Sequence, residues 1–140
     1  MYKGNDLDVY LDCQTVSEYL IKEELDAEDI AEGLVPEEMW LKIGYSHHAV
    51  KRMNNDYGRQ TEQTEVEDII LAKSHYLFSA RDGEEFSFVN EQHTIVIPVV
   101  VRFIGGNIFL FIPTVIRKVI VVNGKEVERK SYARKGSKVL

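Results

Sequence analysis

The chain has 140 residues and a mass of 16.1 kDa, enough for one domain with its own core and too short for two ordinary domains. Its 44% hydrophobic and 29% charged residues exclude an intrinsically disordered protein. No apolar run reaches the roughly 18 residues of a membrane span, and residues 1–6 have no hydrophobic signal region. Cys13 is the only cysteine, which excludes an internal disulfide and a thiolate metal cluster. We therefore expect a cytoplasmic protein.

The net charge of −6 is unevenly distributed along the chain. Residues 1–45 carry twelve acidic and three basic side chains, whereas the chain from Arg117 onward carries eight basic and two acidic ones. Such asymmetry predicts that different faces meet different partners. A basic C-terminal segment is typical of nucleic-acid contact, and it is equally typical of a solvated chain end.

Short helices are predicted in the first third of the chain. Thr15 to Glu18 has the spacing of a capping box, which favours a helix over 15–25. A second short helix is expected over 26–30. Pro36 suits a first helical position and predicts a third helix over 37–43.

Two further helices are predicted in the middle of the chain. Ser46 is a good N-cap for a helix over 47–53. A polar loop over 54–60 follows it, and Thr64 to Glu67 is a second capping box that leads into another helix.

After Ser74 the hydrophobic periodicity changes to that of strands. Strands are predicted over 75–79, 85–89, 94–104 and 108–122, with a last short strand over 126–128 after a turn at Asn123-Gly124. The fold class is therefore α+β, with short N-terminal helices packed on a mainly antiparallel sheet of about four to five strands. The chain divides into an acidic helical segment (1–44), an α+β core (45–123) and a basic C-terminal strand or tail (124–140).

The predicted hairpin around Gly105-Gly106 would place two prolines opposite each other. A two-residue Gly105-Gly106 loop sets Pro98 directly opposite Pro113, and neither proline can donate a ladder hydrogen bond. Either the hairpin splits locally at the prolines, or the loop includes Asn107 and the register shifts by one residue.

The four histidines are the strongest candidates for chemistry, because imidazole titrates nearest neutrality. They are His47, His48, His75 and His93. Adjacent His47 and His48 diverge by about 100° on a helix, which does not suit a shared metal ion. The sequence also has no phosphate-binding glycine loop, nucleophile elbow or histidine–glutamate zinc motif. We expect neither a metal nor a cofactor.

His48 and Arg52 lie one helical turn apart, away from the stripe that Ala49 and Met53 are expected to bury. This spacing places a proton acceptor beside a cation that binds phosphate. The first turn of a helix disfavours positive charge and so favours a neutral imidazole at His48. The alternative is an ordinary surface histidine on a short helix.

The segment Tyr45–Met53 (YSHHAVKRM) resembles the S-x-H-A-x-x-R-M start of a family of small bacterial and phage proteins with a RelE-like fold. It is also similar to the corresponding segment of RegB-type phage endoribonucleases, and the match extends to Val122. In both families helices precede an antiparallel sheet of about four strands. By motif position, His48 corresponds to the family histidine and Arg52 to the arginine. RegB-type enzymes carry a second histidine on the next helix, which this chain lacks; His75 lies just beyond it.

The resemblance implies a metal-independent endoribonuclease of phage or toxin type that attacks phosphate with the ribose 2′-hydroxyl. It would act in a bacterial or phage-infected cytoplasm. His48 would be the base and Arg52 the phosphate clamp, with His75 or His93 as the acid. The basic side chains expected to bind RNA are Lys51, Arg102, Arg117 and Lys118.

A non-catalytic binding protein is the main alternative. The acidic segment 1–45 repels RNA and attracts a basic protein surface, which favours a protein that inhibits a host factor or docks on RNA or the ribosome. The same segment would instead cover the cleft of an enzyme as an autoinhibitory arm. A third reading is a structural subunit that adds a strand at the edge after Val122.

Overall fold

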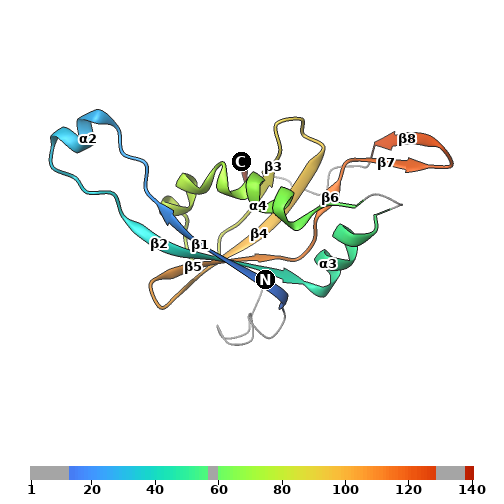
Figure 1. Ribbon diagram of the computed structural model, residues 1–140, viewed down its shortest axis with the longest axis horizontal. Helices are drawn as coiled ribbons and strands as arrows, with labels where there is room; N and C mark the ends of the chain where they lie inside the picture. Colours follow the sequence, from blue (N-terminus) through green and yellow to red (C-terminus); the bar gives the residue numbers. More distant parts are fainter. Residues whose placement is uncertain (1–12, 57–59, 129–137) are drawn as a thin grey trace.

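The computed structural model describes residues 13–56, 60–128 and 138–140. Over these ranges it is an α+β protein with a seven-stranded, mostly antiparallel sheet in the order β1-β2-β5-β4-β3-β9, in which β6 also pairs with β4 (Figure 1). The strands of this sheet are β1 (Cys13–Lys22), β2 (Glu38–Ser46), β3 (Glu85–Val89), β4 (Ile95–Ile104), β5 (Asn107–Ile112), β6 (Ile116–Arg117) and β9 (Lys138–Val139). A separate hairpin contains β7 (Val119–Val122) and β8 (Lys125–Glu128). The helices are α2 (Ala27–Ala31), α3 (His47–Asn54), α4 (Gln63–Leu71) and the 3-10 helix η1 (Ser74–Ser79).

The predicted α+β class is confirmed, but the sheet has more strands than expected, because two segments predicted to be helical are strands. The prediction of helices over 15–25 and 37–43 was wrong: these residues form most of β1 and β2. Exposure alternates along β1, with Leu20 outside and Ile21 inside, which is the period of a strand. β2 pairs with β5 in parallel, so residues 38–44 belong to the same sheet as the predicted core.

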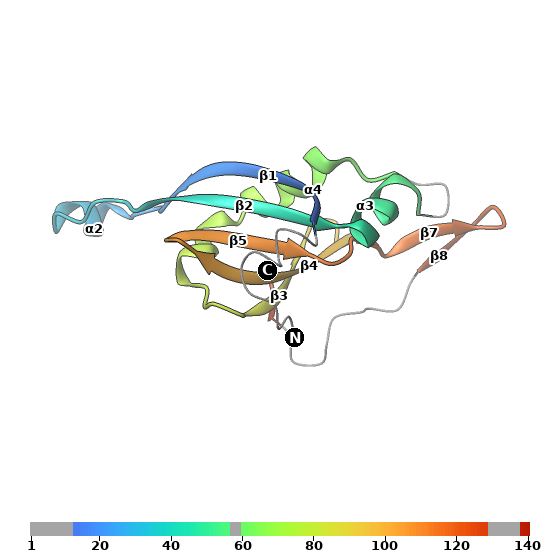
Figure 2. The same cartoon turned by 90° about the horizontal axis from the view of Figure 1, so that it is seen from below.

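The β1–β2 hairpin extends beyond the sheet and carries α2 at its tip (Figures 1 and 2). The helix predicted over 26–30 is confirmed here. Asp26 caps it by accepting a hydrogen bond from the backbone N–H of Asp29 at 2.7 Å, and Asp29 completes the capping box.

The helices α3 and α4 follow β2 and cover one face of the sheet. Ser46 caps α3 as predicted, accepting from the backbone N–H of Ala49 at 3.0 Å. The strand predicted over 75–79 was wrong, because these residues form η1, in which Leu77 alone is buried. The core lies between these helices and the inward face of the strands, and its largest fully buried side chains are Tyr45, Phe88, Leu41, Ile43, Ile70, Leu77, Ile97, Ile108, Leu110 and Ile112.

The β4–β5 hairpin resolves the proline conflict by splitting. Ile104 pairs with Asn107, so the loop is Gly105-Gly106, and both glycines adopt positive φ. β5 ends at Ile112, before Pro113, and β4 then pairs with β6 in a register shifted by one residue. Pro98 faces Ser87 of β3 instead of Pro113.

The β7–β8 hairpin confirms the predicted turn at Asn123-Gly124, where both residues have positive φ. It projects from the same side of the molecule as α3 (Figure 2). Of the predicted basic tail, residues 129–137 lie outside the described part of the chain. In the described ranges, no helix is long and apolar enough to cross a membrane.

Candidate functional site

Helix α3 begins where β2 and β5 end. Tyr45 pairs with Ile112 at the end of β5, and the next residue, Ser46, donates its hydroxyl to the carbonyl of Pro113 at 2.7 Å. The same hydroxyl oxygen caps the helix. The first turn of α3 is therefore fixed to the segment that leads from β5 into β6.

His48 and Arg52 lie one turn apart on α3, as the sequence predicted. The helix buries Ala49 and Met53, whereas the side chain of His48 is exposed and that of Arg52 is partly exposed. Asp56, only 2% exposed, binds Arg52 Nη1 through Oδ1 at 3.1 Å. This buried carboxylate holds the guanidinium of Arg52 and partly neutralises its charge. His48 lies one helical turn earlier in α3. Lys51, exposed on the same helix, adds a second positive charge.

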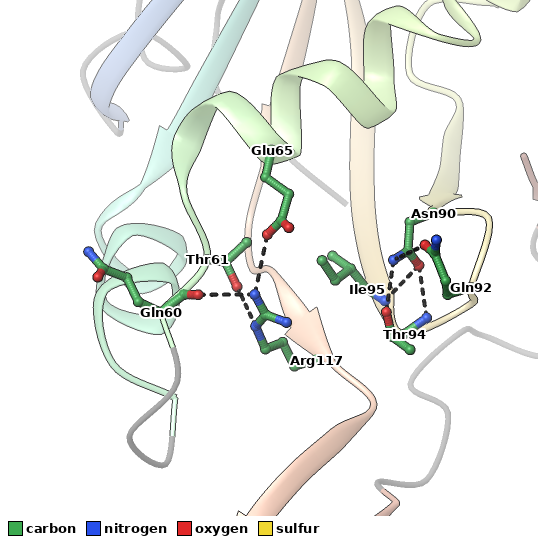
Figure 3. A network of polar contacts seen from close by, with 8 residues as sticks. All are labelled: Gln60, Thr61, Glu65, Asn90, Gln92, Thr94, Ile95 and Arg117. Atoms are coloured by element: carbon green, nitrogen blue, oxygen red, sulfur yellow. Dashed lines mark hydrogen bonds and ion pairs between the residues drawn. The ribbon is translucent and has the colours of Figure 1, made fainter.

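Arg117 of β6 lies next to the connection between α3 and α4 (Figure 3). Its Nε donates to Thr61 Oγ1 at 2.8 Å, and its Nη2 donates to the carbonyl of Gln60 at 3.0 Å and to Glu65 Oε1 at 3.2 Å. Predicted to bind RNA, Arg117 instead uses these donors to join β6 to the start of α4. Its charge remains on the side of the molecule where α3 lies, but it is partly neutralised by Glu65.

His93 lies outside α3, in the connection between β3 and β4. It occupies the β3–β4 turn with a φ of 56° and is exposed. Asn90 holds this turn by accepting from the backbone N–H groups of Thr94 and Ile95 (Figure 3). Lys118 is joined to the same turn, because its backbone N–H donates to the carbonyl of Thr94 at 2.8 Å.

His75 and Arg102 are placed apart from α3. His75 is exposed on η1, beyond the far end of α4, and its ring lies 4.3 Å from that of Tyr76. Arg102 binds Asp82 through Nε at 3.1 Å, near the β4–β5 loop. The backbone N–H of Phe103 is the main cause of the lowered pKa of Asp82, and Arg102 lowers it further. Arg102, which the sequence analysis expected to bind RNA, thus has a carboxylate partner.

An open groove of about 450 Å³ lies between α4 and the β3–β4 turn, and sequence reasoning did not predict it. Its lining includes Glu62, Glu65, Asp68, Asn90 and Gln92. The three carboxylates repel phosphate, which makes this groove a poor site for RNA. Among the residues in the described ranges, no group of three or more His, Cys, Asp or Glu side chains is placed to hold a metal ion.

The capping box predicted over Thr64 to Glu67 was wrong, because the N-cap of α4 is Glu62 and it has no side-chain cap hydrogen bond. The most connected polar group of the described structure is instead Glu67 of α4. Its carboxylate is 4% exposed and accepts from Ser17 at 2.7 Å, from Tyr45 at 2.6 Å, from Gln63 at 3.0 Å and from Tyr19. Burial raises the pKa of Glu67, but the hydrogen bonds from these neutral donors outweigh burial, so the pKa is lowered.

The same network acts on the two tyrosines. The hydrogen bond to Glu67 is the main cause that raises the pKa of Tyr19 to about 12, and burial is the main cause of the raised pKa of Tyr45. Because all of these side chains are engaged with one another beneath α4, the network joins α4 to β1 and β2. We assign it to structure and not to chemistry.

The described site residues therefore separate into two groups. His48, Lys51 and Arg52 share α3. The others lie elsewhere: Arg117 on β6, Lys118 joined to the β3–β4 turn that carries His93, His75 on η1 and Arg102 on β4. An exposed imidazole beside an oriented guanidinium can accept a proton next to a bound phosphate. Comparison with protein-family models, curated proteins and solved structures found no match to this chain.

Proposed function

We propose that the chain is a metal-independent endoribonuclease whose reaction centre is the outer face of α3. The observation that carries the proposal is the His48–Arg52 pair: an exposed imidazole one turn from a guanidinium that a buried carboxylate, Asp56, holds in place. The order from α3 to β5 supports it: two helices are followed by three antiparallel strands, as in the RelE-like and RegB-type proteins that Tyr45–Met53 resembles, although β1 and β2 precede the helices in this chain. That support is analogy of fold, and the site carries the argument.

In the proposed reaction His48 accepts the proton of a ribose 2′-hydroxyl. The 2′-oxygen then attacks the adjacent phosphorus, the bond to the 5′-oxygen breaks, and a 2′,3′-cyclic phosphate forms. Arg52 binds the non-bridging oxygens and stabilises the charge that develops on them. The departing 5′-oxygen takes a proton from solvent.

The test is cleavage of structured and single-stranded RNA in excess chelator. We expect His48→Ala to lower the rate by about 100-fold or more, the size of a general-base contribution. His47→Ala is the matched control, because His47 is an equally exposed neighbour on the same helix. A substrate with 2′-deoxyribose at the cleaved position should be resistant. Equal loss in both variants, or cleavage of the deoxy substrate, would contradict the mechanism.

RNA binding without cleavage is the second candidate, and the separation of the histidines favours it. Apart from its sequence neighbour His47, the other histidines of the described residues lie outside α3, and His48 alone supplies a base but no acid. Under this alternative the wild type cuts no RNA, and Arg52→Ala weakens RNA binding whereas His48→Ala leaves it unchanged. Cleavage by the wild type, together with the effects of His48→Ala on cleavage and on RNA binding, therefore separates the candidates.

A further inference from the structure

In the described part of the chain, one edge of strand β1 is unpaired. It is the first strand in the sheet order, it is ten residues long, and in the described ranges only β2 pairs with it. Its outward face carries an apolar pair near the end of the strand: Leu20 is 54% exposed and lies opposite Trp40, which is 45% exposed. Long edge strands with exposed apolar residues are templates for pairing with another chain.

The hydrogen bonds of β1 show which residues face that edge. The backbone N–H of Glu23 donates to the carbonyl of Glu37 at 2.8 Å, one step beyond the Lys22–Glu38 pair. In an antiparallel ladder alternate residues bond to the same partner strand, so the odd-numbered residues of β1 bond to β2. The N–H of Trp40, opposite Leu20, donates to Asn107 on the other side of β2, which agrees with this parity. The N–H and C=O groups of Glu18, Leu20 and Lys22 therefore point to the free edge.

We propose that two copies of this chain form a dimer by pairing their β1 strands antiparallel, with Leu20 opposite Leu20 at the two-fold axis. This register places Glu18 of each copy opposite Lys22 of the other. Across β2 within each copy, Glu18 already faces Lys42, and Lys22 faces Glu38. The two sheets then join into one, with charges that alternate in sign along each flanking row and the Leu20 and Trp40 side chains between the rows.

Other antiparallel registers that also keep the hydrogen bonds between the two β1 edges lose the Glu18–Lys22 charge pairs. A shift one way sets Glu18 opposite Leu20, and a shift the other way sets Leu20 opposite Lys22. Larger shifts set Glu18 opposite Glu18 or Lys22 opposite Lys22. The charge pattern of β1 thus selects a single self-complementary register, which is a property expected of an isologous interface.

In this dimer the charge of the β1–β2 hairpin tip is also complementary to that of helix α3 in the other copy. The tip between β1 and β2, residues 23–37, has seven acidic and no basic side chains. Antiparallel pairing carries this tip past Cys13 of the other copy, which pairs with Ser46, the N-cap of α3. Helix α3 carries Lys51 and Arg52 and no acidic residue. The acidic tip of one copy therefore approaches the basic helix of the other.

Sedimentation equilibrium of the full chain tests the proposal. We expect a mass near twice 16.1 kDa at about 100 µM protein, well above the dissociation constants of stable interfaces. Leu20→Lys places like charges at the axis and should raise the dissociation constant about tenfold or more. Val127→Lys is the matched control, because Val127 is 44% exposed on a strand of the separate β7–β8 hairpin. A monomeric wild type, or a dimer that Leu20→Lys leaves unchanged, would overturn the proposal.

A charge exchange tests the register itself. Glu18→Lys alone and Lys22→Glu alone each create like-charge pairs across the axis, so each variant should be monomeric. An equimolar mixture restores opposite charges in both rows and should form heterodimers, which native mass spectrometry distinguishes from homodimers. Circular dichroism of each variant verifies folding. Folded variants that remain monomeric when mixed would exclude this register.

Discussion

The buried carboxylate of Glu67 accepts hydrogen bonds from neutral side chains. These donors differ in burial, so we expect them to contribute unequally to the stability of the fold. Tyr45 is fully buried, whereas Tyr19 is partly exposed, and both donate to Glu67. Removing a donor from a buried carboxylate costs more when water cannot replace it. The two hydroxyls therefore form a matched pair for mutation.

We expect Tyr45→Phe to lower the free energy of unfolding by about 1–3 kcal/mol, as for a buried polar group that loses its partner. Tyr19→Phe should cost less, because solvent reaches that side of the carboxylate. Urea denaturation of the two variants measures the difference. Equal losses would mean that water already reaches the Tyr45 side of the network.

The lowered pKa of Glu67 gives the network an acid dependence. A carboxyl whose pKa is lower in the folded state contributes stability above its unfolded pKa, and that contribution is lost as the pH falls through the folded pKa. We expect the urea midpoint of the wild type to fall in this acid range more steeply than that of Glu67→Gln. Parallel midpoint curves for the two proteins would show that another carboxyl dominates acid unfolding.

Gly44 is required by a close approach of side chains. A Cβ atom at this position would lie 2.5 Å from Cys13 Sγ and 2.6 Å from Phe109 Cζ. Because Phe109 is buried and cannot move freely, we expect Gly44→Ala to lower the free energy of unfolding by about 1–3 kcal/mol. Thermal denaturation measures this loss. In a Cys13→Ala background one of the two contacts is gone, so the penalty should be smaller there; an unchanged penalty would place the clash on Phe109 alone.

At the scale of elements, the sequence predicted best where local signals and tertiary packing agree. Ser46 caps α3 as expected, and the glycine turns at Gly105-Gly106 and Asn123-Gly124 lie at the expected positions. The split in the β4–β5 hairpin also followed from chemistry, because Pro113 cannot donate to a ladder. These features depend on a few adjacent residues, which a sequence displays directly.

Strand β1 shows where this reasoning fails. Thr15 to Glu18 has capping-box spacing, yet the segment is extended, because Ser17 and Tyr19 turn inward to bind Glu67 fifty and forty-eight residues away. Polar residues inside and Leu20 outside hide the alternation that identifies a strand. No local signal indicates a buried glutamate in α4 that these residues satisfy.

The candidate site also contains features that the sequence predicts and features that it does not. The spacing of His48 and Arg52 on one helix could be predicted, because a helix relates residues four apart. The positions of His75, His93 and Arg102 relative to α3 depend on strand order and on the β3–β4 turn, which spacing does not encode. The partner of Arg117, the start of α4, is likewise set by tertiary packing.

The contacts of Arg117 predict that its removal loosens the connection between α3 and α4. Arg117→Ala removes three donors to the connection between α3 and α4, so we expect faster amide hydrogen exchange over residues 60–65. Lys118→Ala is the control, because Lys118 is joined to Thr94 through its backbone, which the substitution retains. Equal exchange in the two variants would mean that Arg117 does not hold this connection.

At the scale of the whole molecule, charge is segregated between the acidic hairpin tip and the side that carries α3. Phosphate contacts release counterions, so the logarithm of RNA affinity should fall linearly with the logarithm of salt concentration. If α3 is the contact surface, Lys51→Ala and Arg52→Ala should each reduce the steepness of that line by about 0.7, the value for one phosphate on single-stranded RNA. Arg81→Ala, an exposed cation in the loop between η1 and β3, should leave the slope unchanged. A slope that changes equally in all three variants would assign the RNA affinity to diffuse charge and remove α3 from the interface.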